Sequence, residues 1–129
     1  MSIPPSFSIP ARFASFSHAV RGLRFMMRSQ HNAWLHAAAT VSVCVAALCL
    51  QVSRIEWCLI VLSIIAVWTA EGFNTALECL TDLASPELHP LAGRAKDVAA
   101  GAVLITAIGA ATVGAVVFAP YVRTVIAGL

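Results

Sequence analysis

Charged residues are scarce in this sequence. Only 11% of its 129 residues are Asp, Glu, Lys or Arg, whereas 60% are hydrophobic and the mean hydropathy is +0.87. Soluble domains carry about a quarter charged residues, so this composition argues against a soluble enzyme and predicts an integral membrane protein. The length suits a single small domain over residues 1–129, without room for a second soluble module.

Several motifs of soluble phosphate and metal chemistry are also missing. The sequence contains neither GxxxxGK(S/T) nor GxGxxG, the glycine-rich loops that cradle phosphates. Its four cysteines form no CxxC pair and share no Cys/His ligand spacing, so neither a zinc site nor a redox motif is indicated. The first ten residues lack the basic start and apolar core of a signal peptide. We expect residues 1–11 to form a flexible tail.

Residues 12–28 have the pattern of an amphipathic helix. One side carries Phe13, Phe16, Val20, Leu23 and Met27, and a neighbouring stripe carries Arg21, Arg24 and Arg28. A basic amphipathic helix lies in the membrane interface, where arginines reach anionic headgroups or phosphates. Two interpretations are open: a plain lipid-surface anchor, or a helix whose arginines hold a phosphate-bearing ligand.

Three membrane spans are expected after this helix, over about 33–52, 55–83 and 96–119. Each has 20 or more residues, which matches a hydrocarbon core of about 30 Å. Six basic residues lie before the first span or between the second and third, whereas only Arg54 and Arg123 lie on the other side. The excess of basic residues therefore predicts a cytoplasmic N-terminus and a cytoplasmic 84–96 connection.

The third span is rich in small residues. Ala107, Ala111 and Ala115 recur at every fourth position, a pattern that permits close helix packing in lipid. Three helices are too few to enclose a polar site from lipid on all sides. We therefore expect a homo-oligomer whose protomers complete one another's pockets.

Four polar side chains interrupt the second span: Glu71, Asn74, Glu78 and Asp82. A carboxylate at membrane depth costs at least about 2–3 kcal/mol, so acids there indicate a functional site. At about 100° per residue the four residues share an arc of about 80° and extend along about 16 Å of helix axis. One helix face thus carries three acids and an amide. Asp82, near the helix end, has an alternative role as a cap or a paired acid.

Two stretches of the sequence resemble the prokaryotic diacylglycerol kinase family, which includes the undecaprenol kinases. They are AEGFNTALECLTDL at 70–83, with the Glu, Asn, Glu and Asp spacing, and SPELHPLAGRAKDVAAGAVLI at 85–105. The resemblance covers roughly residues 13–118. It implies an all-α membrane protein with an N-terminal surface helix and three spans, assembled as a homotrimer in the bacterial inner membrane. Such enzymes move the γ-phosphate of MgATP onto a lipid hydroxyl.

The resemblance also implies roles for individual residues. Glu71 is expected to be the general base and to contact the lipid substrate together with Asn74, which orients the transferring phosphoryl group. Glu78 is expected to bind Mg²⁺. Expected nucleotide contacts are Asn74, Glu87, His89, Lys96 and Asp97.

The segment around the first expected helix adds three further candidates. Arg12 is expected to contact the lipid substrate, and His18 the nucleotide. Gln30 occupies a position where the family usually has a metal-binding glutamate. An amide oxygen can ligate Mg²⁺ but brings no negative charge. We expect Gln30 to bind metal and nucleotide, and an active enzyme because the second-span constellation is complete.

Alternatives remain at this point. The acceptor implied by the resemblance is either diacylglycerol, giving phosphatidic acid, or undecaprenol, giving undecaprenyl phosphate. A catalytically weak or silent relative with a regulatory role is suggested by Gln30. A small proton-coupled transporter using Glu71 is a third class, because acids in membrane helices serve proton relays. That class leaves Lys96 and Asp97 unexplained.

Overall fold

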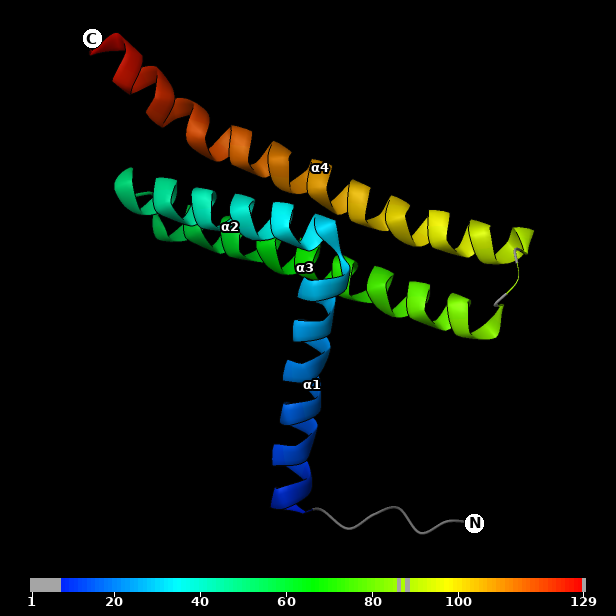
Figure 1. Ribbon diagram of the computed structural model, residues 1–129. Helices are drawn as coiled ribbons and strands as arrows, with labels where there is room; N and C mark the ends of the chain where they lie inside the picture. Colours follow the sequence, from blue (N-terminus) through cyan, green and yellow to red (C-terminus); the bar gives the residue numbers. More distant parts are fainter. Residues whose placement is uncertain (1–7, 86, 88, 129) are drawn as a thin grey trace.

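The computed structural model describes residues 8–85, 87 and 89–128 (Figure 1). Its helices are α1 (Ile9–Ser29), α2 (His31–Cys49), α3 (Arg54–Ala84) and α4 (Pro90–Ala127). The last three are long and apolar enough to cross a membrane. The expectation of a helical protein with three spans is confirmed. The tail expected over 1–11 lies mostly outside the described residues, but α1 already begins at Ile9, with a proline in its first turn, where a missing N–H costs nothing.

Helix α1 projects away from the other three helices, and only its C-terminal end touches them (Figure 1). Met26 is buried there, close to Gly72 of α3. Gln30 ends α1 and caps α2 with an extended backbone, φ −110° and ψ 117°, which turns the chain sharply between the two helices. The corner therefore places Gln30 beside α3. A position of α1 on the membrane surface stays a prediction.

Helices α3 and α4 pack along one another more extensively than any other pair. The buried apolar cluster at the α2–α3 turn comprises Ala47, Val52, Ile60 and Val117. The turn begins earlier than expected, because α2 ends at Cys49 and Gln51 adopts φ 52°, a left-handed conformation. The cluster fixes this end of the bundle.

Helix α4 extends beyond the expected span at both ends. It begins at Pro90 because the His89 side chain accepts a hydrogen bond from the Leu91 N–H, 3.2 Å, and caps the helix. The helix continues through Pro120 to Ala127, so it is longer than the expected span, and where that span ends in the membrane stays a prediction. A proline inside a membrane helix is tolerated, although it removes one backbone hydrogen bond. The next residue, Tyr121, donates from its hydroxyl to Glu56 of α3.

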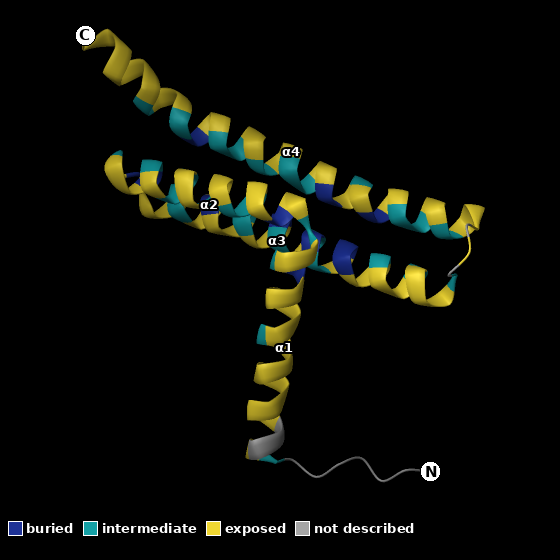
Figure 2. Ribbon diagram, viewed as in Figure 1, coloured by how far each residue is buried: buried dark blue, intermediate teal, exposed yellow. Residues whose placement is uncertain are grey.

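Burial within one chain is concentrated in the interior of the bundle, and Figure 2 shows buried residues gathered where α1 meets α2 and α3. The outer faces carry large exposed apolar side chains, such as Leu62, Ile105 and Val116. Apolar surface of this extent suits contact with lipid or with further protein. The expected homo-oligomer stays a prediction.

Candidate active site

The polar face of α3 points into the protein. Glu71, Asn74 and Thr75 are buried, and the Glu71 side chain has no exposed surface. The helical period directs these positions to the side where α1, α2 and α4 converge. The Thr75 hydroxyl is satisfied within the helix, since it donates to the Glu71 carbonyl at 2.9 Å. The burial of this acid therefore agrees with the expectation that the second span holds a site.

Two amides hold the carboxylate of Glu78. Gln30 Nε2 donates to Glu78 Oε2 at 2.5 Å, and Asn74 Nδ2 donates to Glu78 Oε1 at 3.1 Å. Gln30 comes from the α1–α2 corner, 48 positions away in the sequence. The α1–α2 corner and α3 thus meet at Glu78. This contact brings together Gln30, Asn74 and Glu78, three of the residues expected at the site.

Glu71 has a different environment. Its Oε2 lies 3.8 Å from His36 Nε2 of α2, beyond hydrogen-bonding distance. Among the described residues, both oxygens of Glu71, His36 Nε2 and Asn74 Oδ1 are buried without a hydrogen-bond partner. Buried polar groups are nearly always paired, so this concentration of unpaired atoms indicates a place where a ligand binds.

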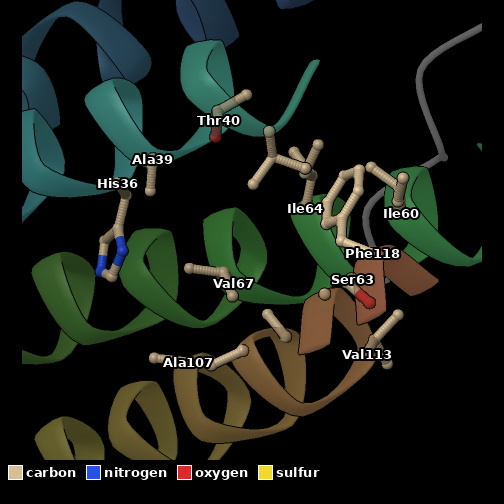
Figure 3. A pocket seen from close by; sticks show the side chains of 14 residues that line it. His36, Ala39, Thr40, Ile60, Ser63, Ile64, Val67, Ala107, Val113 and Phe118 are labelled. Carbon is tan, nitrogen blue, oxygen red and sulfur yellow. The ribbon is translucent and has the colours of Figure 1, made fainter. Parts of the chain in front are cut away.

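These residues surround a polar hollow of about 250 Å³. Its walls come from α2, through Asn32 and His36, from the polar face of α3, and from α4, through Ala100 and Ala107. A second, apolar hollow of about 380 Å³ lies between the same helices and shares His36 and Ala107 with the first (Figure 3). Small residues of α4 leave the room for it. The two hollows thus meet at His36.

Asp82 and Lys96 form an ion pair that joins α3 to α4 near their connection. Both side chains are exposed, at 68% and 38%. The structure thus pairs Asp82, one of the two roles considered for it. Ala100, one helical turn after Lys96, lines the polar hollow with Glu78, so Lys96 lies on the same side of α4 as the hollow.

The remaining expected residues lie farther out. Glu87, His89 and Asp97 are exposed at the connection and at the start of α4. Arg12 and His18 are exposed on the part of α1 that projects from the bundle (Figure 1). The structure does not bring these two residues to Glu71 of the same chain. The roles expected for all five stay predictions.

His36 is the residue that reasoning from the sequence missed, because no motif includes it. Its ring lies edge-on to Trp68 of α3, with centroids 6.4 Å apart and planes at 68°. Trp68 Nε1 in turn donates to Thr40 Oγ1 at 3.1 Å. An ionisable side chain inside an apolar span is itself a signal of function, and that signal was available.

The side chains around Glu78 restrict the kind of metal ion that could bind there. Among the residues the structure describes, no three His, Cys, Asp or Glu side chains cluster as a metal site. Glu78 supplies one carboxylate, and Gln30 and Asn74 supply amide oxygens once their amides turn over. Mg²⁺ is commonly held by one or two carboxylates together with substrate phosphates. The donor set therefore fits Mg²⁺ that shares its coordination with a nucleotide.

A multi-pass helical membrane protein with acids in a buried hollow is the class that this fold and site define. Comparison with known proteins gives the family. The family described as prokaryotic diacylglycerol kinase matches residues 17–118. The chain therefore belongs to the prokaryotic diacylglycerol kinase family and is a lipid kinase.

Several relatives share most of the chain. Undecaprenol kinase of Bacillus subtilis (strain 168) is 41% identical over 108 residues, which cover 84% of this chain and 88% of that protein. A diacylglycerol kinase of Synechocystis sp. is 38% identical over 86% of this chain but only 64% of its own length. Diacylglycerol kinase of Escherichia coli (strain K12) is 32% identical, covering 72% and 82%. The resemblance stated from the motifs is confirmed.

Proposed function

We propose that this protein transfers the γ-phosphate of MgATP to the hydroxyl of a membrane lipid. The observation that carries the proposal is the buried carboxylate of Glu71, which has no hydrogen-bond partner among the described residues and lies in a polar hollow that adjoins an apolar one. A lipid alcohol presents a polar end and an apolar chain, and the two hollows match these parts. Family membership supplies the reaction class.

Glu71 is proposed as the general base. Phosphoryl transfer needs alignment, charge neutralisation and a group to receive the proton of the attacking hydroxyl. Both oxygens of Glu71 are free of partners among the described residues, so one can accept that proton. Asn74 lies one turn away on the same helix face, with its Oδ1 also unpaired, and orients the phosphoryl group between base and metal site.

Glu78 and Gln30 are proposed to hold Mg²⁺, with the Gln30 amide turned so that its oxygen faces the cation. When bound, the ion neutralises charge on the nucleotide phosphates. Gln30 already contacts Glu78, so the two ligands need no approach by the helices. Because Gln30 brings no charge, most of the metal affinity depends on Glu78 and the phosphates.

The nucleotide is proposed to bind at the α3–α4 connection. Lys96 supplies an ammonium for the phosphates after release from Asp82, and Asp97, Glu87 and His89 contact the rest of the nucleotide. The basic residues flanking the spans support a cytoplasmic location for this end, where ATP is available. The proposed location is the bacterial inner membrane.

A homotrimer is proposed to complete the site. Helix α1 projects from its own bundle and keeps Arg12 and His18 away from their own Glu71 (Figure 1). In an assembly the same helix can reach a neighbouring protomer, where Arg12 contacts the lipid and His18 the nucleotide. The exposed apolar faces of the three long helices supply surface for such contacts.

The identity of the acceptor lipid distinguishes the two activities in the relatives' names, undecaprenol kinase and diacylglycerol kinase. Purified protein is incubated with labelled ATP and Mg²⁺ in mixed micelles containing either undecaprenol or dioleoylglycerol. We expect label in at least one lipid, and the ratio of kcat/KM values identifies the preferred acceptor. Label in neither lipid overturns the proposed function.

A catalytically silent relative is the second candidate, because Gln30 occupies both the metal position and one oxygen of Glu78. Under that alternative the native protein transfers no label while Gln30→Glu restores turnover. Measurable turnover by the native protein excludes it.

A further inference from the structure

We infer that His36 positions the acceptor hydroxyl for attack. In this arrangement the imidazole Nε2–H donates a hydrogen bond to the hydroxyl oxygen, while the hydroxyl donates its own hydrogen to Glu71. The inference rests on the proposed function, and it adds a substrate-positioning residue that the sequence motifs do not contain.

The distance between the two side chains supports this role. His36 Nε2 and Glu71 Oε2 lie 3.8 Å apart, and both atoms are buried without a hydrogen-bond partner among the described residues. A single oxygen at about 2.8 Å from each atom satisfies both, since two such hydrogen bonds close a triangle over that gap. A hydroxyl is the group that can donate to one atom and accept from the other at the same time.

The location of His36 identifies the alcohol as a lipid. His36 lines both hollows, so an oxygen held by its ring lies where the polar hollow meets the apolar one. The apolar hollow is walled by Val67 and Ile64 of α3 and by Ala107 and Phe118 of α4 (Figure 3). A hydrocarbon chain in this hollow brings its terminal hydroxyl to the ring.

A contact with Trp68 of α3 restricts the imidazole ring of His36. Trp68 meets it edge-on, and the Trp68 indole N–H is fixed to Thr40, one turn along α2 from His36. The ring therefore has limited freedom to turn away from Glu71. A donor with a fixed direction aligns the hydroxyl, and alignment of reacting groups is a large part of the catalysis of phosphoryl transfer.

In the proposed phosphoryl transfer, His36 keeps its proton throughout. The acceptor O–H bond breaks and Glu71 takes the proton, while the oxygen forms a bond to the γ-phosphorus. The bond between the γ-phosphorus and the bridging oxygen breaks, and ADP leaves with that electron pair. Glu71 later returns its proton to water.

The first test separates positioning from folding by kinetics. His36→Leu removes the donor, whereas His36→Gln retains an N–H near the same place. We expect His36→Leu to lower kcat/KM for the acceptor lipid about tenfold or more with KM for ATP within twofold, and His36→Gln to recover much of the loss. Ser42→Ala, on an exposed position of α2, is the matched control. Unchanged lipid kinetics in His36→Leu, or a rise in KM for ATP as large as the loss of kcat/KM for the lipid, overturns the inference.

The second test needs no ATP and no turnover. The protein is labelled with ¹⁵N in its histidine rings, and the His36 signals are assigned by comparison with His36→Gln. Dioctanoylglycerol and farnesol are added in micelles, each beside an analogue with hydrogen in place of the hydroxyl. We expect the His36 Nε2 signal to move with at least one alcohol and not with its analogue. Equal movement with alcohol and analogue, or none with either, overturns the inference even where kinase activity is intact.

Discussion

Two glutamates of α3, Glu56 in its first turn and Glu71 near its middle, have opposite environments. Glu56 accepts hydrogen bonds from the Ser53 N–H and from Tyr121 Oη, each at 2.7 Å, and completes a capping box with Ser53. Glu71 is more deeply buried, yet neither of its oxygens has a partner among the described residues. A satisfied acid stabilises a helix end, whereas an unsatisfied buried acid costs stability and persists for function.

Neutralising Glu71 is the strongest test of the contrast between the two acids. We expect Glu71→Gln to lower kcat for lipid phosphorylation by about 10²–10⁴-fold, because the proton acceptor is lost. The unfolding temperature in detergent should equal or exceed that of the wild type, since the cost of burying a carboxylate is removed. Activity is measured by label transfer and unfolding by circular dichroism.

Glu56→Gln, in the first turn of the same helix, is the matched control. It is expected to keep lipid phosphorylation within about twofold of the wild type, because the partners of Glu56 among the described residues are the cap and Tyr121. Loss of activity in both variants to the same degree contradicts the distinction between the two acids.

A second prediction concerns Glu78, the acid between two amides. We expect Glu78→Gln to lower kcat/KM for MgATP by roughly 100-fold, since it removes the carboxylate proposed to bind the metal. Binding of Mn²⁺ in the presence of ADP, followed by electron paramagnetic resonance, should weaken in parallel. Asp82→Asn, which weakens the exposed pair with Lys96, is the control and should have a smaller effect. Unchanged Mn²⁺ binding in Glu78→Gln places the metal elsewhere.

Introducing a carboxylate at position 30 is a further test of the proposed metal site at Glu78. Gln30→Glu puts two acids side by side, so we expect the metal-free protein to unfold at a lower temperature. Mg²⁺ should raise that temperature more than it does for the wild type, and the Mg²⁺ concentration for half-maximal activity should fall about tenfold. The measurements are unfolding curves and initial rates over a Mg²⁺ titration. Gln30→Asn, which keeps the amide but shortens its reach, controls for disturbance of the corner between α1 and α2.

The sequence allowed most of the fold to be predicted, because long apolar runs and a scarcity of charge leave few alternatives to membrane helices. The polar face of α3 followed from helical periodicity, and the burial of Glu71 and Asn74 agrees with it. Helix ends were less predictable, since a capping contact at His89 marks where α4 begins and the helix continues through Pro120. Such contacts depend on tertiary neighbours.

His36 shows the other limit. A lone histidine in an apolar span carries no spacing that links it to α3, and its position 3.8 Å from Glu71 depends on how α2 packs on α3. The same holds for the contact between Gln30 and Glu78, which joins positions far apart in the sequence. Motif spacing finds residues on one helix face, whereas the meeting of two helices requires the fold.

The smallest effect is expected at the end of the bundle where Tyr121 donates a hydrogen bond to Glu56. Tyr121→Phe removes the hydroxyl that reaches Glu56 and leaves the ring, so the unfolding temperature should fall by only a few degrees. Lipid phosphorylation should stay within about twofold of the wild type, because this bond lies at the opposite end of α3 from Glu78. Thermal unfolding and label transfer on one preparation check both parts. A large loss of activity with unchanged stability would mean that the two ends of α3 are coupled, and that the satisfied acid also serves the site.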